Sequence, residues 1–219
     1  MKVAVIQHIS FEGLGYIEEW IKNNNHELLL IKTFEQEPLP NPQNFDYLII
    51  LGGPMSVHDQ ETWLAEERQL IKLTLDLNLP IFGICLGAQQ IAKTLGAEVV
   101  PTPKEVGWGR VDFSMDLLNA TVNQSFEVLH WHGEGFTLPN QAILIAQSQE
   151  WVNQGFRYGN AIGLQFHLET DDQARHNILK HDEYFIKDNV LNQTVELILN
   201  HPIAFANKKL LFDLLNSIG

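Results

Sequence analysis

The chain has 219 residues, of which 45% are hydrophobic, and a formal net charge of −13 at pH 7. This length suits one α/β domain with a large core, and a chain so acidic lacks the basic face that a nucleic-acid partner requires. No apolar run approaches the roughly 20 residues of a membrane-spanning helix. The start of the chain does not resemble a signal peptide, and one cysteine cannot form an internal disulfide, so we expect a cytoplasmic protein.

In chain order, the first half alternates short apolar strands with amphipathic helices, which indicates a parallel, doubly wound sheet. The active crevice of such a sheet lies at the carboxyl ends of its strands. Thr62 is a candidate N-cap, and the proline-rich segment 33–44 is expected to be a loop. The expected strands are residues 2–7, 28–31, 47–51 and an apolar run from Pro80, and the expected helices are 15–24 and 63–77.

After about residue 98 the pattern changes to strands separated by short turns, and from Asp171 it returns to helix. No linker separates the halves, so we expect a single domain over 1–219, with a core of about 1–170 and a helical C-terminal extension of about 171–219. The expected strands are 99–113, 126–131, 143–147, 151–158 and 161–167, and the later helices are 190–199 and 205–218.

The cysteine of the chain, Cys85, lies between two glycines in the pattern G-x-C-x-G. This is the pattern of a nucleophile elbow, with cysteine in place of serine. Such a turn strains the backbone of the nucleophile, and Gly83 and Gly87 would let the strand and the next helix approach closely. The helix N-terminus would also favour the thiolate. On this pattern alone, a buried structural cysteine is an equally good interpretation.

A second candidate group lies at His167 and Glu169. In an extended strand, residues two apart face the same side, so the carboxylate could orient the imidazole. A cysteine nucleophile needs such a base, and the base needs such an orienting group. Taken alone, a histidine at this position is more often a satisfied structural residue.

Three stretches together resemble a class I (triad) glutamine amidotransferase domain, and in particular the glutaminase domain of GMP synthase and its stand-alone relatives. They are residues 52–54, 83–89 and 165–169, with weaker likeness at 104–108 and 130–134. The resemblance covers about residues 1–170 and implies a flavodoxin-like, three-layer α/β sandwich with a mostly parallel central sheet and a β-rich second half. Two positions depart from the pattern: Leu168 replaces the usual Pro, and Glu134 replaces the Asp of the GMP synthase group.

The resemblance also implies roles for individual residues. Cys85 would attack the side-chain amide of glutamine, His167 would act as general base and then acid, and Glu169 would orient His167. Backbone N–H groups of Gly53 and Leu86 would form the oxyanion hole. The substrate would be held by Gly52, Gln89, Trp131, Gly133 and Glu134. No cofactor and no metal are implied.

Several alternatives remain open at this point. The chain could be the glutaminase subunit of a two-chain enzyme, delivering ammonia to a synthase subunit, because 219 residues leave no room for a synthase domain. It could instead hydrolyse glutamine alone, or cleave other γ-glutamyl compounds such as γ-glutamyl peptides. A catalytically silent binding module is a further alternative. A metal site at His130, His132 and His167 is disfavoured, since no cysteine or carboxylate cluster completes it. Nucleotide binding by a P-loop is also disfavoured, since no P-loop sequence occurs.

Overall fold

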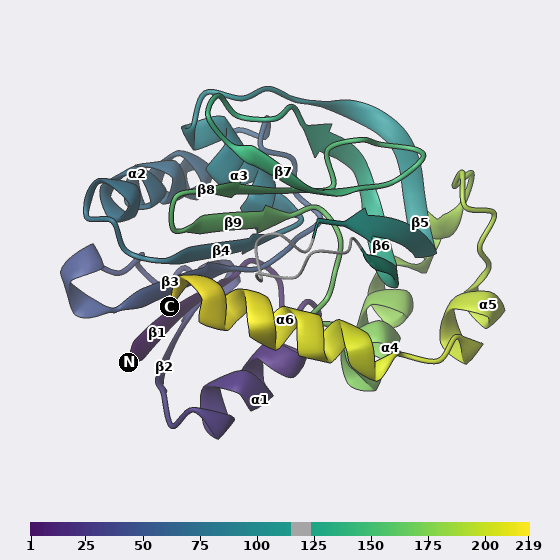
Figure 1. Ribbon diagram of the computed structural model, residues 1–219, viewed down its shortest axis with the longest axis horizontal. Helices are drawn as coiled ribbons and strands as arrows, with labels where there is room; N and C mark the ends of the chain where they lie inside the picture. Colours follow the sequence, from purple (N-terminus) through teal and green to yellow (C-terminus); the bar gives the residue numbers. More distant parts are fainter. Residues whose placement is uncertain (115–123) are drawn as a thin grey trace.

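The computed structural model describes residues 1–114 and 124–219, and Figure 1 shows a central sheet with helices packed around it. Within the described residues the sheet has nine strands in the order β2-β1-β3-β4-β9-β8-β7-β5-β6. The strands are β1 (Lys2–Gln7), β2 (Glu27–Lys32), β3 (Tyr47–Ile50), β4 (Ile81–Ile84), β5 (Val99–Phe113), β6 (Gln124–Phe136), β7 (Ile143–Gln147), β8 (Gly155–Tyr158) and β9 (Ala161–Leu164). The α-helices are α1 (Tyr16–Asn23), α2 (Thr62–Asp76), α3 (Leu86–Thr94), α4 (Asp172–Asp182), α5 (Val195–Asn200) and α6 (Phe205–Ile218).

The strands β2, β1, β3, β4 and β9 are parallel neighbours, as the alternation of strands and helices predicts. Every residue of β3 and β4 is buried, which is typical of parallel strands covered on both faces. Because these strands run the same way, their carboxyl ends meet at one edge of the sheet. The nucleophile-elbow sequence follows β4 at this edge.

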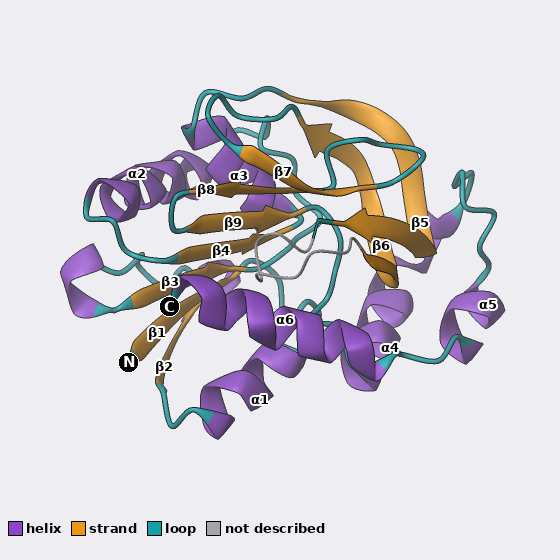
Figure 2. Ribbon diagram, viewed as in Figure 1, coloured by secondary structure: helices purple, strands orange, loops and turns teal. Residues whose placement is uncertain are grey.

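The strands of the second half extend the same sheet in antiparallel fashion, from β9 through β8, β7 and β5 to β6 (Figure 2). The β5 and β6 strands form a long ribbon at the far edge. The β-rich second half is therefore continuous with the first, and the expected α/β fold class is confirmed.

Helices cover both faces of the sheet and complete three layers. On one face, α2 and α3 pack against apolar side chains of β1, β3 and β4. On the opposite face, α1 and α6 pack against the alternate side chains of the same strands. A smaller apolar cluster joins the β5–β6 ribbon to α4 and α5.

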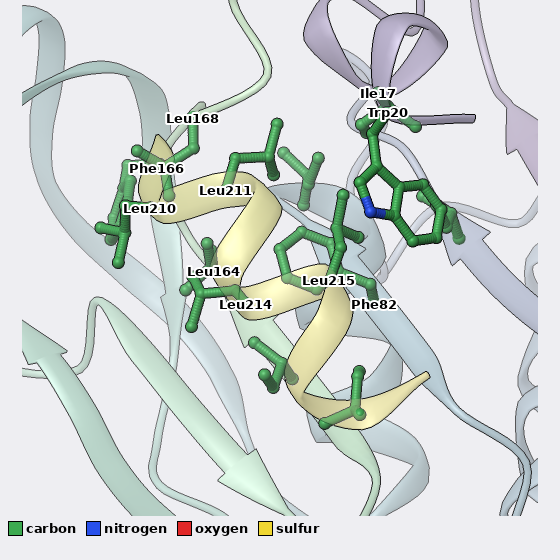
Figure 3. Packing of buried hydrophobic residues seen from close by; sticks show 14 of the residues in the cluster. Ile17, Trp20, Phe82, Leu164, Phe166, Leu168, Leu210, Leu211, Leu214 and Leu215 are labelled. Carbon is green, nitrogen blue, oxygen red and sulfur yellow. The ribbon is translucent and has the colours of Figure 1, made fainter. Parts of the chain in front are cut away.

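The C-terminal helix α6 belongs to the core and is not an appendage. Its leucines insert among side chains of the sheet and of α1, as Figure 3 shows. Leu211, Leu214 and Leu215 have no exposed surface, and the Tyr47 hydroxyl donates a hydrogen bond to the carbonyl of Leu215, with an oxygen–oxygen distance of 3.2 Å. None of the described helices is both long enough and apolar enough to cross a membrane.

The structure corrects the expected start of two helices. Thr62 is the first residue of α2 and not its N-cap; Glu61 occupies that position without a side-chain cap. The helix expected from residue 190 begins only at Val195, after the N-cap Thr194. The reason is local: the Asn189 side chain bonds backbone groups of Ile186 and Gln193 and so offers the chain an alternative to the helix.

Three other expected boundaries also change. The segment 33–44 contains two single-turn 3₁₀ helices, at Thr33–Glu35 and Pro42–Asn44. The strand expected from residue 151 begins at Gly155, because a turn between Ser148 and Trp151 precedes it. The last strand ends at Leu164 and not at His167, and His167 instead forms an isolated bridge with Leu129 of β6.

Candidate active site

Cys85 lies at the turn between β4 and α3, at the N-cap position of the helix. Its φ is +49° and its ψ is −109°, a conformation that non-glycine residues rarely adopt. Two backbone hydrogen bonds hold this geometry: the Cys85 N–H donates to Leu164 over 2.8 Å, and the Gln89 N–H donates to the Cys85 carbonyl over 3.0 Å. The strained turn that the motif predicts is present.

The two glycines of the motif occupy positions where a side chain would collide. A Cβ on Gly83 would lie 2.7 Å from the backbone carbon of Gly87 and 2.8 Å from the nitrogen of Ala88. A Cβ on Gly87 would overlap the backbone carbonyl of Ile50 in β3. The glycines therefore allow the helix to start directly against the sheet.

His167 and Glu169 form a short, buried pair beside the turn. The distance from His167 Nδ1 to Glu169 Oε1 is 2.6 Å, and a backbone bond from the His167 N–H to Leu129 anchors this segment to β6. Burial opposes the charged imidazole, but the Glu169 carboxylate and the neighbouring Cys85 outweigh it and hold the His167 pKa well above 6.5. Between the pair, Leu168 packs in the apolar core near α6 (Figure 3).

Gly52, directly after β3, marks the point where the cysteine and the histidine meet. A Cβ on Gly52 would lie 3.1 Å from His167 Cε1 and 3.5 Å from Cys85 Cβ. Cys85 and His167, 82 positions apart in the sequence, therefore border one point at the carboxyl edge of the sheet. A nucleophile, a charged imidazole and a carboxylate in this order can perform acyl transfer.

A cavity of about 400 Å³ opens at this edge next to Cys85. Six of the residues that sequence analysis assigned to the site line this cavity: Gly53, Cys85, Gln89, Trp131, Gly133 and Glu134. Gly52, Leu86, His167 and Glu169 do not line it; His167 and Glu169 instead border a smaller void of about 20 Å³. The Gln89 side chain spans the cavity wall, donating to the Glu134 carbonyl over 3.1 Å and to Gln165 over 3.2 Å.

Glu12, Asp182 and Phe185 also line the cavity, although no sequence motif marked them. Glu12 follows β1 at the same edge of the sheet, so the rule that active crevices form at strand carboxyl ends could have indicated it. Burial and repulsion from Glu169 raise its pKa from 4.5 to about 7, against the attraction of His167. Asp182 accepts a hydrogen bond from Trp131 Nε1 over 2.8 Å. It comes from the end of α4, and no local signal marks it.

His8 is a further buried residue at this edge, directly after β1. Its Nδ1 lies 3.0 Å from the Gly52 carbonyl oxygen, and its Nε2 lies 2.7 Å from Glu67 Oε2. Burial opposes protonation, yet Glu67 and the Gly52 carbonyl together raise the His8 pKa. Because the Gly52 carbonyl and the Gly53 N–H belong to one peptide group, His8 fixes the direction of that N–H.

In the structure, the residues that could form a metal site differ from those considered in the sequence. His167 is paired with Glu169, whereas His130 and His132 lie with the buried carboxylate of Glu105. Contrary to the expectation that no cysteine or carboxylate accompanies these histidines, Glu105 lies beside His130 and His132 because β5 pairs with β6.

Comparisons with known proteins agree with this geometry. The family model described as glutamine amidotransferase class-I matches residues 17–185. The glutamine amidotransferase-like protein YfeJ of Salmonella typhimurium is 30% identical over 200 residues, covering 86% of this chain and 84% of that protein. GMP synthase of Prochlorococcus marinus strain MIT 9515 is 31% identical over 137 residues, covering 59% of this chain and 24% of the synthase.

Solved structures show the same arrangement of the chain. A glutamine amidotransferase from Thermotoga maritima has a TM-score of 0.86 at 32% identity and covers 100% of this chain and 96% of its own. A glutamine amidotransferase from Methylobacillus flagellatus has a TM-score of 0.91 over 100% of this chain and 95% of its own; its 24% identity supports the fold alone. With a family model that matches most of its length, the chain belongs to the class I glutamine amidotransferases.

Proposed function

We propose that this protein hydrolyses the side-chain amide of glutamine, releasing glutamate and ammonia, through a γ-glutamyl thioester on Cys85. The observation that carries the proposal is the position of Cys85, in a left-handed conformation at the start of α3, beside the His167–Glu169 pair. The family assignment makes glutamine the first substrate to test.

In the proposed reaction, the Cys85 thiolate attacks the γ-carbonyl carbon of glutamine. The carbon–nitrogen bond then breaks, and the departing ammonia takes a proton from the His167 imidazolium. Water attacks the resulting thioester while His167 accepts its proton, and glutamate leaves with the thiol restored. Glu169 orients the ring throughout and stabilises it whenever it carries the proton, consistent with the raised His167 pKa.

Charge develops on the carbonyl oxygen of the substrate during both steps. We assign its stabilisation to the backbone N–H groups of Gly53 and Leu86, the first after β3 and the second at the start of α3. Loss of one such donor typically slows a reaction by about 10²–10³. Gln89, Trp131, Gly133 and Glu134 line the cavity and are the proposed contacts for the amino and carboxylate groups of glutamine.

The released ammonia has two proposed fates. In one, a separate synthase subunit accepts it, as the likeness to the glutaminase part of GMP synthase suggests; the chain matches only 24% of that synthase. In the other, the protein is a self-sufficient hydrolase. We place either form in the cytoplasm, where the free thiol of Cys85 stays reduced.

A second candidate function is cleavage of γ-glutamyl compounds other than glutamine. The cavity of about 400 Å³ falls within the range of about 300–1,000 Å³ that holds drug-sized ligands, and glutamine is smaller than these. A cavity of this size could also hold a substituent on the amide nitrogen. The same triad would perform the reaction, with an amine as leaving group.

One assay separates these functions. The purified protein is offered glutamine and a panel of γ-glutamyl peptides and amines, and ammonia, glutamate and free amine are measured. Steady release of ammonia from glutamine supports the main proposal, and slow release that rises steeply with a partner supports the subunit form. Preference for a γ-glutamyl peptide over glutamine supports the second candidate function, cleavage of other γ-glutamyl compounds. No turnover of any substrate, together with unaltered Cys85 after exposure to a glutamine-like electrophile, would indicate a silent binding module.

A further inference from the structure

A buried cluster of one carboxylate and two imidazoles lies on the β5–β6 ribbon, outside the His167–Glu169 pair. Glu105 of β5 is directly opposite His132 of β6, and His130 lies two residues along β6 on the same face. The exposed fractions of the three residues are 1%, 0% and 3% for Glu105, His130 and His132. Gly109 leaves room for one ring, since a Cβ there would lie 3.1 Å from His130 Nε2.

The three side chains direct potential ligand atoms toward a common point. The distances are 3.3 Å from His130 Nδ1 to His132 Nε2, 3.5 Å from His132 Nε2 to Glu105 Oε2, and 3.7 Å from His130 Nδ1 to Glu105 Oε1. A tetrahedral zinc ion bound at about 2.0–2.2 Å separates its ligand atoms by about 3.3–3.6 Å. The two ring nitrogens have the spacing of two corners of a zinc tetrahedron, and the Glu105 carboxylate, with a different oxygen nearest to each ring, lies at the third.

The Glu105 carboxylate is buried without a permanent positive charge beside it. Its two oxygens accept hydrogen bonds from the neutral groups Ser148 Oγ, over 3.0 Å, and Gln154 Nε2, over 2.6 Å. Among the described residues, no lysine or arginine side chain forms an ion pair with Glu105, and the two imidazoles are its closest basic groups. A bound cation would supply the countercharge that a buried carboxylate requires.

The two inner ring nitrogens can either share a hydrogen bond over 3.3 Å or both carry lone pairs, and the second arrangement is the one that binds a cation. His130 Nε2 and His132 Nδ1 are buried and form no hydrogen bond with any described residue. With the proton of each neutral ring on this outer nitrogen, both inner nitrogens present lone pairs toward Glu105. Two lone pairs and a carboxylate at this spacing are the donor set of a divalent cation.

We propose that Glu105, His130 and His132 bind one zinc ion. Two imidazoles and a carboxylate suit this metal, and a water could complete the tetrahedron. His132 also borders the cavity, and Trp131 lies between the two ligands and reaches Asp182 on the cavity side. The ion would therefore fix the strand that forms one wall of the cavity. This site is separate from the triad and does not depend on the proposed reaction.

Metal uptake by the intact wild-type protein is the first test. The protein is dialysed against a chelator and titrated with cobalt(II), whose visible absorption reports four-coordinate binding. We expect one cobalt per chain with the strong absorption of tetrahedral coordination, and its displacement by one equivalent of zinc. The absence of such a spectrum in the folded wild-type protein would overturn the proposal without recourse to any variant.

Variants then assign the ligands. Glu105→Gln and His130→Gln should weaken zinc binding by more than about 100-fold, beyond the effect expected from changes outside the ligand set. They should also abolish the rise in melting temperature that zinc causes in the wild type. His176→Gln, which removes an exposed histidine of α4, is the matched control and should bind as the wild type does. Equal zinc affinity in Glu105→Gln would mean adventitious binding, for example at exposed histidines, and would overturn the proposed site.

Discussion

At the scale of single residues, the reactivity of Cys85 depends on groups contributed by distant parts of the chain. His167→Ala should remove nearly all turnover and slow alkylation of Cys85 by a glutamine-like electrophile, because the thiolate loses its cationic partner. Glu169→Gln should retain some turnover, since an orienting group is less essential than the base. Cys85→Ser, which should lose both the adduct and turnover, is the control. An unchanged rate in Glu169→Gln would assign the third role to another carboxylate, of which Glu12 is the first to test.

The raised pKa of Glu12 leads to a second prediction about a single residue, namely how the stability of the protein depends on pH. Its carboxyl has a pKa of about 7 in the folded protein and about 4.5 when unfolded. The unfolded state therefore loses its proton first, and stability falls as pH rises from about 4.5 to 7 and then levels off. Glu12→Gln removes this dependence. As pH rises from about 4.5 to 7, the free energy of unfolding of the variant should therefore increase relative to that of the wild type by up to about 3 kcal/mol.

Urea denaturation at several pH values measures this difference. Glu66→Gln, at an exposed position of α2, is the control and should follow the wild type. A constant difference between Glu12→Gln and the wild type at every pH would show that the Glu12 carboxyl titrates normally.

At the scale of elements, the turn between β4 and α3 depends on contact with β3. Gly87→Ala should lower the free energy of unfolding by about 1–3 kcal/mol, because the new Cβ would overlap the Ile50 carbonyl and force the helix from the sheet. Gly13→Ala is the control, since a Cβ there meets no atom within 4 Å. Equal stability of the two variants would mean that α3 can shift without cost.

The segment after β3 gives a further prediction, which depends on the proposed oxyanion hole. His8→Gln should reduce kcat by about tenfold with little change in KM, since the Gly52–Gly53 peptide loses its orienting bond while its N–H remains. Alkylation of Cys85 should keep its wild-type rate, because the nucleophile and its base are untouched. If kcat, the alkylation rate of Cys85 and the free energy of unfolding all fall together, His8 instead has a purely structural role.

At the scale of the whole molecule, the C-terminal helix completes one layer of the core. Leu214→Ala in α6 should lower the free energy of unfolding by about 2–5 kcal/mol, because this side chain is fully buried against the sheet. Phe205→Ala, in the same helix but 76% exposed, should change it by less than about 0.5 kcal/mol. Equal effects in denaturant titrations would mean that α6 is not part of the cooperative unit.

The sequence by itself determined the features that depend on neighbouring residues. Apolar strands alternating with helices predicted the parallel half, and the glycines around Cys85 predicted its strained turn, because both patterns act within a few residues. The pairing of His167 with Glu169 was also predicted, although through an extended strand that in fact ends at Leu164. The two side chains still meet, since they are only two residues apart.

Only the tertiary structure decided which distant polar groups join the site. Glu12, Asp182 and His8 reach the cavity or its supporting peptide from separate loops and helix ends, and no local periodicity marks them. Likewise, Glu105 meets His130 and His132 through the register of β5 on β6, and α6 finds its place by covering apolar side chains of the sheet. The physical reason is that register and packing are set by long-range burial, in which each segment depends on partners far away in the sequence.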